Sequence, residues 1–186
     1  MSTALDWWTF AQDAPELARS GWHLLNGAAR MADRGGQDDE HGCASVLLAT
    51  PRNDGGVRLR PCRPLLDDGR LYLRLEDGTA AARDLRRDGR FGIRARDGSE
   101  FRIEGTAVLQ QDPVLRARIT ARADPEGVDA DVLFELLLEQ AGLTRPALVQ
   151  PGRTGAAPEM TTIRRRASNT AAGQIRWRCL GRRACA

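Results

Sequence analysis

Short apolar runs separated by tight polar turns fill the middle of this 186-residue chain, and this pattern constrains its fold more than any other feature. Turns rich in Asp, Asn and Gly separate the runs, and several runs alternate apolar with polar residues, as strands with one buried face do. The predicted strands are residues 44–50, 57–60, 71–75, 91–94 and 101–108. Because such hairpins are too short for parallel crossovers, we expect a mainly antiparallel sheet that closes into a small barrel.

Helix signals flank and interrupt these strands. Asp13, Pro15 and Glu16 form a helix start, and apolar residues follow at helical spacing, which predicts a helix over residues 15–25. Residues 79–87 are rich in helix formers, and an Asp-Pro pair opens another predicted helix over 112–122. Residues 129–139 are apolar and fit either a helix or a strand. The predicted fold class is therefore α+β, with helices beside an antiparallel barrel.

The positive charge is concentrated at the end of the chain. The sequence holds 28 basic residues, all of them arginine, against 25 acids. Residues 151–186 carry eight of the arginines and a single acid, Glu159, so the preceding part is mildly acidic. We expect a folded domain over residues 1–155 and a basic, poorly ordered tail over 156–186. An acidic body makes nucleic acid an unlikely partner for the domain.

Cysteine and histidine usage argues against a metal site. The four cysteines form no CxxC pair and only two histidines exist, so we expect no structural zinc. No apolar run is long enough for a transmembrane helix, and no secretion signal is visible. We therefore expect a cytoplasmic protein with free thiols and no membrane association. His23 stands beside Trp22 on a predicted helix, which favours a packed residue over a catalytic base.

Five segments in order resemble the pyridoxamine 5′-phosphate oxidase-like family, the FMN-binding split barrels. The most specific is Thr79–Arg90, TAAARDLRRDGR, which is similar to the family's SPKARDLRRDPR. The others are the hairpin formed by residues 44–50, Asp54-Gly55 and residues 57–61 (VRLRP), residues 68–73 (DGRLYL), residues 101–107 (FRIEGTA), and a terminal piece that is either Pro151-Gly152-Arg153 or Trp177-Arg178. The resemblance implies a split β-barrel that binds FMN, usually at the interface of a homodimer.

The resemblance also implies where the cofactor lies. The flavin ring would follow the strand Arg58–Pro61, and the phosphate would meet arginines, a hydroxyl and the amides of a helix N-terminus. Arg58 and Arg60 alternate with Val57 and Leu59, which we take as core residues, so both arginines are expected on the non-core face. The candidate cofactor-binding residues are Arg58, Leu59, Arg60, Pro61, Thr79, Ala81 and Arg83.

One position departs from the family. Ala81 stands where the family often has a lysine that contacts the phosphate. Losing one charge-assisted contact costs about 1.5–3 kcal/mol, which is about ten- to a hundredfold in affinity. FMN binding would then be weak, rely on Arg83, or be absent.

Three functions remain open from the sequence. The first is an FMN-dependent oxidoreductase that acts on a small organic substrate, with the cofactor carrying the reaction. The second is a deazaflavin-dependent reductase on the same fold, in which the cofactor's longer anionic tail would use Arg83, Arg86 and Arg87. The third is a non-catalytic module that binds a flavin-like ligand or, through the tail, nucleic acid. No catalytic side chain is identified.

Overall fold

A computed structural model describes residues 4–32, 45–97, 99–123, 131–146, 160–169 and 175–185. The helices are α1 (Trp7–Asp13), α2 (Pro15–Ala32), α3 (Ala80–Asp88) and α4 (Pro113–Ala123). The first strands are β1 (Ser45–Pro51), β2 (Val57–Pro61), β3 (Pro64–Asp67), β4 (Arg70–Glu76) and β5 (Arg90–Asp97). They are followed by β6 (Ser99–Gln110), β7 (Asp131–Pro146), β8 (Met160–Asn169) and β9 (Ile175–Cys185).

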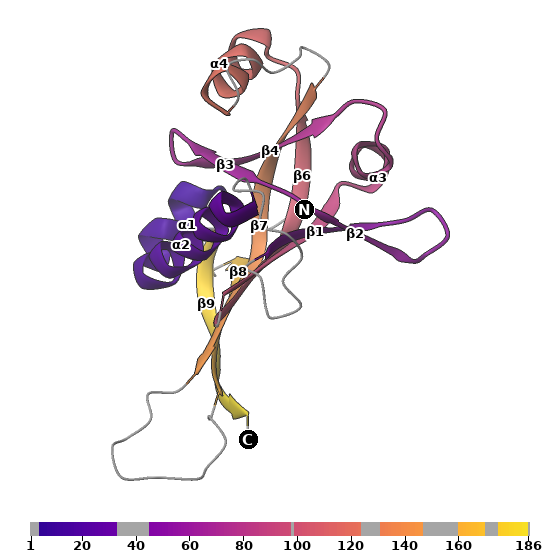
Figure 1. Ribbon diagram of the computed structural model, residues 1–186. Coiled ribbons are helices and arrows are strands. Elements are labelled where there is room, and N and C mark those ends of the chain that lie inside the picture. The colour runs from indigo at the N-terminus through magenta and orange to yellow at the C-terminus, as the bar shows by residue number, and fades with distance from the viewer. Residues whose placement is uncertain are drawn as a thin grey trace.

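Every strand pair in the described residues is antiparallel, and the strands run β2-β1-β5-β6-β7-β4-β3 along one curled sheet. Strand β7 divides one of its edges between two partners: Asp131–Glu135 pairs with β4, and Gln140–Pro146 pairs with β8. The sheet therefore splits along β7, and the predicted α+β fold with a mainly antiparallel split barrel is confirmed (Figure 1).

Strands β8 and β9 lie within residues 156–186, the segment that the sequence predicts to be a basic, poorly ordered tail. β8 pairs with the second half of β7, and β9 pairs with β8. The physical reason is that β7 is 16 residues long and extends beyond β4, which leaves backbone N–H and C=O groups that another strand can satisfy. Ala167 of β8 is buried in the main core.

Helices α1 and α2 cover one face of this sheet and bury the main core (Figure 1). Phe101 of β6 is fully buried there, and a Cβ on Gly21 of α2 would lie 2.3 Å from its ring. Glycine at this position therefore lets the helix approach the sheet closely. No helix of the described residues is long and apolar enough to cross a membrane.

Several elements differ from the sequence expectation, and strand β3, like β8 and β9, was not predicted. The helix predicted over 15–25 continues to Ala32, and the ambiguous segment 129–139 belongs to strand β7. Helix α1 was not predicted; Asp6 caps it by accepting a hydrogen bond from the backbone N–H of Thr9 at 2.8 Å. The other predicted helices and strands are confirmed within a few residues of their expected bounds.

Candidate functional site

The edge strand β2 carries four of the seven candidate residues, and its orientation is the reverse of the one predicted. Val57 and Leu59 are 64% and 65% exposed, whereas Arg58 and Arg60 are half-buried. Cross-strand register explains this: Arg58 pairs with Thr50 and Arg60 with Leu48, and both partners on β1 are buried. The two arginines do share a face, but it is the covered face.

A buried carboxylate holds Arg58 on that face. Asp84 of α3 is 5% exposed and accepts a hydrogen bond from Arg58 Nε at 2.8 Å. The hydroxyl of Thr50 donates to the same carboxylate oxygen at 3.1 Å, and Arg87 reaches the other oxygen at 3.3 Å. Arg87 also donates to the backbone carbonyl of Pro51. This cluster ties α3 to the β1–β2 hairpin.

The cluster keeps Asp84 charged. Burial alone would raise the pKa of the Asp84 carboxyl, but the hydrogen bonds from Arg58 and Thr50 and the charge of Arg87 hold the pKa below its ordinary value. Arg58 uses its Nε–H for this bond; a guanidinium has five N–H donors, so it can also contact a second anion.

The N-terminus of α3 is built by Thr79. Its hydroxyl accepts a hydrogen bond from the backbone N–H of Ala82 at 3.3 Å and donates to the carbonyl of Glu76 at 2.9 Å. Ala81 is 1% exposed and packs in the main core. Its side chain therefore faces away from solvent, and only its backbone N–H belongs to the first turn of the helix.

Two arginines near this helix end have no ion-pair partner among the described residues, Arg60 and Arg83. The bond between Arg58 and Asp84 joins β2 to α3. Arg60 follows Arg58 by two residues and therefore lies on the same face of β2. Arg83 precedes Asp84 on α3 and is exposed.

Cys62 lies just beyond β2 and is shielded from solvent. Burial raises the pKa of its thiol to about 12, although the positive charge of Arg60 opposes the shift. The thiol therefore stays protonated near neutral pH and packs as a small apolar group.

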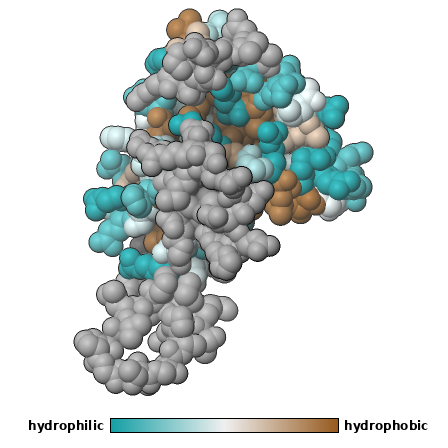
Figure 2. Space-filling view, viewed as in Figure 1, coloured by the Kyte–Doolittle hydropathy of each residue, from teal (hydrophilic) through white to brown (hydrophobic). Residues whose placement is uncertain are grey.

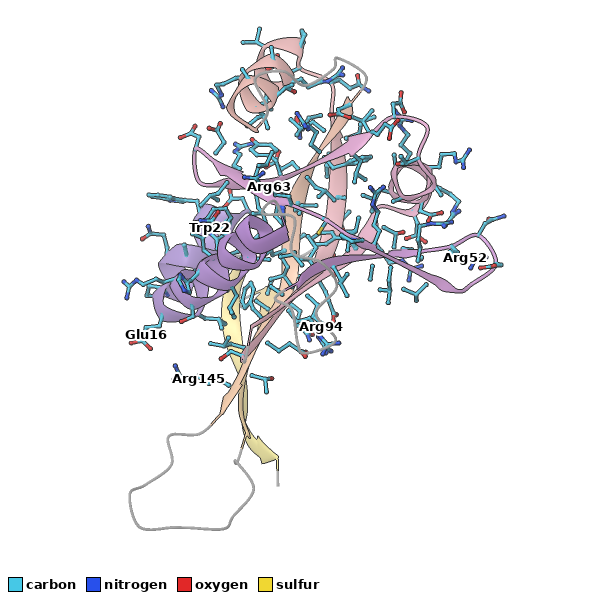
Figure 3. The ribbon with its side chains drawn as sticks, viewed as in Figure 1. Glu16, Trp22, Arg52, Arg63, Arg94 and Arg145 are labelled. Atoms are coloured by element: carbon cyan, nitrogen blue, oxygen red, sulfur yellow. The ribbon has the colours of Figure 1, made fainter. Side chains whose placement is uncertain are left out.

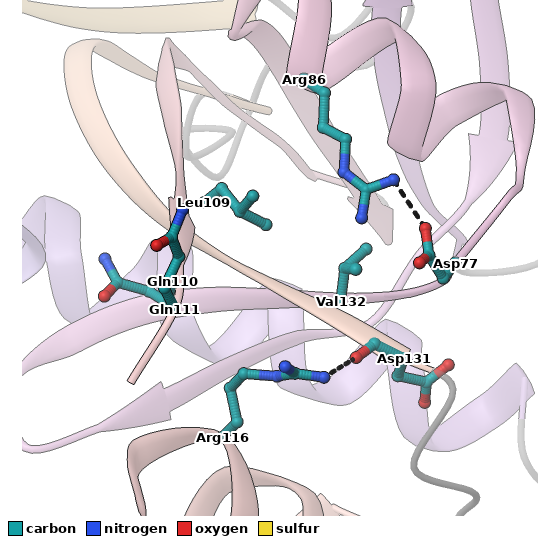
Figure 4. Close-up of a pocket in the computed structure, with 8 residues that line it drawn as sticks. All are labelled: Asp77, Arg86, Leu109, Gln110, Gln111, Arg116, Asp131 and Val132. Atoms are coloured by element: carbon teal, nitrogen blue, oxygen red, sulfur yellow. Dashed lines mark hydrogen bonds and ion pairs between the residues drawn. The ribbon is translucent and has the colours of Figure 1, made fainter. Parts of the chain in front are cut away.

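A cleft of about 360 Å³ lies on the other side of α3, lined by α3, β6, β7 and α4 (Figure 4). Its charged groups are largely paired with one another. Arg86 and Asp77 form an ion pair at 2.6 Å, and Arg116 donates to the backbone carbonyl of Asp131 at 2.8 Å. Hydrogen bonds to Arg86 and to the backbone of Gly78 lower the pKa of Asp77. None of the seven candidate cofactor residues lines this cleft.

The structure thus brings the candidate residues of β2 and α3 to one surface but gives them unequal roles. Sequence reasoning missed Asp84 and Thr50, which organise that surface. A signal for Asp84 exists: it follows the buried Ala81 by three residues and precedes the buried Leu85, so helical spacing places this acid on the inward face. Among the described residues, no group of His, Cys, Asp and Glu is arranged to hold a metal ion.

Comparisons with known proteins identify the fold. No family model matches the sequence, and no curated protein matches it. PhzG from Burkholderia lata 383, solved in complex with tetrahydrophenazine-1-carboxylic acid, is 14% identical, with a TM-score of 0.54 over 90% of this chain and 92% of that one. HupZ from Group A Streptococcus is 16% identical, with a TM-score of 0.51 over 66% of this chain and 90% of that one.

A further similar structure is a Clostridium acetobutylicum protein of the pyridoxinephosphate oxidase family, related to general stress protein 26. It is 14% identical, with a TM-score of 0.47 over 66% of this chain and 88% of that one. The resemblance seen in the sequence is confirmed at the level of the fold: the chain has the split-barrel fold of the pyridoxamine 5′-phosphate oxidase-like family.

Proposed function

We propose that the protein is an FMN-binding oxidoreductase that acts on a small organic substrate. The observation that carries the proposal is the bond between Arg58 of β2 and Asp84 of α3, which joins two elements that carry Arg60 and Arg83, cations without an ion-pair partner among the described residues, and the capped N-terminus of α3. A phosphate monoester carries about two negative charges, and helix amides with guanidinium groups are suited to bind it.

The residues fit an FMN phosphate, with a division of roles that differs from the sequence expectation. Arg60 and Arg83 would supply the charge, and the backbone amides of the first turn of α3, including that of Ala81, would supply further donors. Arg58 would act mainly by holding Asp84, with its remaining N–H groups able to reach the ligand. The missing lysine at position 81 is offset in this scheme by Arg83.

The exposed apolar side chains of β2 fit a contact with a second subunit. Val57 and Leu59 lie on the outer face of the edge strand, opposite Arg58 and Arg60, where they would pack against that subunit. Figure 2 shows hydrophobic side chains at the surface on the side of the molecule where Figure 1 places β2. Apolar residues on an open edge strand support a homodimer, in which a second copy would complete this shallow site.

The structure favours FMN over the deazaflavin coenzyme. A longer anionic tail would need Arg83, Arg86 and Arg87 together, yet Arg86 pairs with Asp77 and Arg87 with Asp84. Only Arg83 of the three has no such partner. The shorter FMN phosphate needs fewer free cations and matches what this surface offers.

Bound FMN would supply hydride transfer at its N5 atom, and the protein would supply binding, orientation and a shielded environment. Arg60 and Arg83 would fix the phosphate, the open backbone edge of β2 would position the ring, and the Asp84 cluster would keep α3 and β2 in register. No described side chain is assigned a proton-transfer role.

Titration of the purified full-length protein with FMN and, in parallel, with the deazaflavin coenzyme tests the proposal. We expect quenching of flavin fluorescence, binding of FMN tighter than that of the deazaflavin, and reduction of bound FMN by a reduced nicotinamide. Absence of quenching at any FMN concentration would refute a flavin function, and tighter binding of the deazaflavin would reverse the choice of cofactor. Gel filtration at several concentrations tests the homodimer.

A further inference from the structure

A second, larger cleft of about 510 Å³ lies on the face of the sheet that α2 covers, away from β2. One wall is α2, which contributes Arg19, Ser20, His23 and Leu24. The other wall is the end of the β6–β7 pair, which contributes Ser99, Leu143 and Arg145. Glu100 pairs with Thr144, so Ser99 and Arg145, each one residue further along, come to the same end of the sheet.

The lining combines an apolar floor with a cationic rim. Leu24 and Leu143 are 8% and 4% exposed and form the floor. Arg19 and His23 are spaced four residues apart and are exposed on one side of α2, and Arg145 is exposed across the cleft. The hydroxyls of Ser20 and Ser99 add polar groups.

Among the side chains that the structure describes, no acid neutralises this cleft. No acid is among its lining residues, and Arg19, His23 and Arg145 form no ion pair within the part of the chain that the structure describes. Glu100 is engaged with Arg94 and with Arg102, which it meets at 2.7 Å. Strand alternation places Glu100 on the opposite face from Ser99. Glu16 is exposed at the start of α2 and forms no ion pair with Arg19 or Arg145.

We propose that this cleft binds a small organic anion, with its acidic group held between Arg19 and Arg145 and its apolar body against Leu24 and Leu143. Guanidinium groups bind carboxylates and phosphates through paired N–H bonds, and hydroxyls at hydrogen-bond distance add direction. The volume lies within the range of small-molecule sites. The cleft beside Arg86 and Asp77 contains its own counter-charges, which is why it is not assigned a ligand.

Calorimetric titration of the full-length protein with three naphthalene probes tests the chemistry. The probes are 2-naphthoate, 2-naphthyl phosphate and neutral 2-naphthalenemethanol, which share one apolar body. We expect both anions to bind at least about tenfold more tightly than the alcohol, since one charge-assisted contact is worth about that factor or more. The ratio between the two anions decides between a carboxylate and a phosphate ligand. Equal binding of all three probes would overturn the proposal.

Variants locate the binding. The double variant Arg19→Gln with Arg145→Gln should weaken 2-naphthoate at least tenfold; both side chains are exposed, so the fold should persist, which circular dichroism verifies. Arg52→Gln is the matched control, because Arg52 lies at the tip of the β1–β2 hairpin, far from Arg145 (Figure 3). Unchanged affinity in the double variant would overturn the assignment.

A nuclear magnetic resonance readout keeps the test independent of variant stability and of the flavin proposal. The chain has only two histidines, so the signal lost in His23→Gln assigns the His23 ring proton. We expect 2-naphthoate to shift this signal and Arg83→Gln to leave the shift unchanged. Displacement of 2-naphthoate by FMN, or an unmoved His23 signal at saturation, would refute a separate site.

Discussion

Replacement of Asp84 by alanine tests the account of how α3 is attached to the edge hairpin. The carboxylate is 5% exposed and receives hydrogen bonds from Arg58 at 2.8 Å, Thr50 at 3.1 Å and Arg87 at 3.3 Å. Asp84→Ala removes all three hydrogen bonds at once. It leaves the Thr50 hydroxyl, which is 1% exposed, without this partner.

The expected loss of folding free energy follows from these exposures. A hydrogen bond to a charged group contributes about 1.5–3 kcal/mol, and Arg58, at 35% exposed, keeps part of its hydration. The Arg87 contact is long and that side chain is 39% exposed, so it adds under about 1 kcal/mol. We expect a net destabilisation of about 2–3 kcal/mol. For a chain of this length, that lowers Tm by about 5–10 °C.

Urea unfolding of a double-mutant cycle measures the pair itself. Asp84→Ala, Arg58→Met and the double variant should give a coupling of about 1–2 kcal/mol. Arg52→Met, which breaks an ion pair with Asp54 on an exposed turn, is the control and should cost under about 1 kcal/mol. A loss in Asp84→Ala no larger than in this control would refute the reasoning.

The pH dependence gives an independent check. Because folding lowers the pKa of Asp84, its stabilising contribution is fully present above the ordinary value of 3.8 and is lost as pH falls through the lower folded value. The stability difference between the wild type and Asp84→Ala should therefore be constant near neutrality and shrink in acid below about pH 4. A difference that grows as pH falls would contradict this sign.

Three further outcomes follow from packing. Gly21→Ala should lower the free energy of unfolding by about 1–3 kcal/mol, because the added Cβ would collide with the Phe101 ring. This loss should exceed the gain from the better helix propensity of alanine. Unchanged urea unfolding would contradict the close approach of α2 to the sheet. Ala81→Lys, which restores the family's lysine, should lower the free energy of unfolding by about 2 kcal/mol or more without tightening FMN binding. The control Ala80→Lys should lower it by under about 1 kcal/mol. Tighter FMN binding by Ala81→Lys would show that this side chain can reach the phosphate. Cys62 should resist alkylation by iodoacetamide at pH 8 until the chain is unfolded, because its thiol has a raised pKa. Peptide mass mapping measures the labelling. Rapid labelling of Cys62 in the native protein would contradict this prediction.

The sequence predicted the hairpins and helices well because their signals are local. Turn residues, alternation and helix-start residues identify an element without knowledge of its neighbours. They also showed correctly that Arg58 and Arg60 share a face. They could not show which face is covered, because that depends on the buried partners Thr50 and Leu48 across the strand pair and on α3, which follows later in the chain.

The end of the chain was interpreted from its charge alone. Residues 160–185 contain seven arginines and no acid, which resembles a solvated tail. In the structure β8 pairs with the part of β7 that extends past β4, and β9 pairs with β8, so this register is a property of the sheet rather than of either segment. The apolar residues of β7 were ambiguous because a strand buried on both faces lacks alternation.

The most direct test of the central claim compares FMN with riboflavin, which has the same ring and no phosphate. If Arg60, Arg83 and the first turn of α3 bind the phosphate, the wild type should bind FMN at least about tenfold more tightly than riboflavin. Arg83→Gln and Arg60→Gln should reduce that ratio while leaving riboflavin affinity unchanged. Equal affinity for the two flavins, or a ratio that neither substitution changes, would contradict the account.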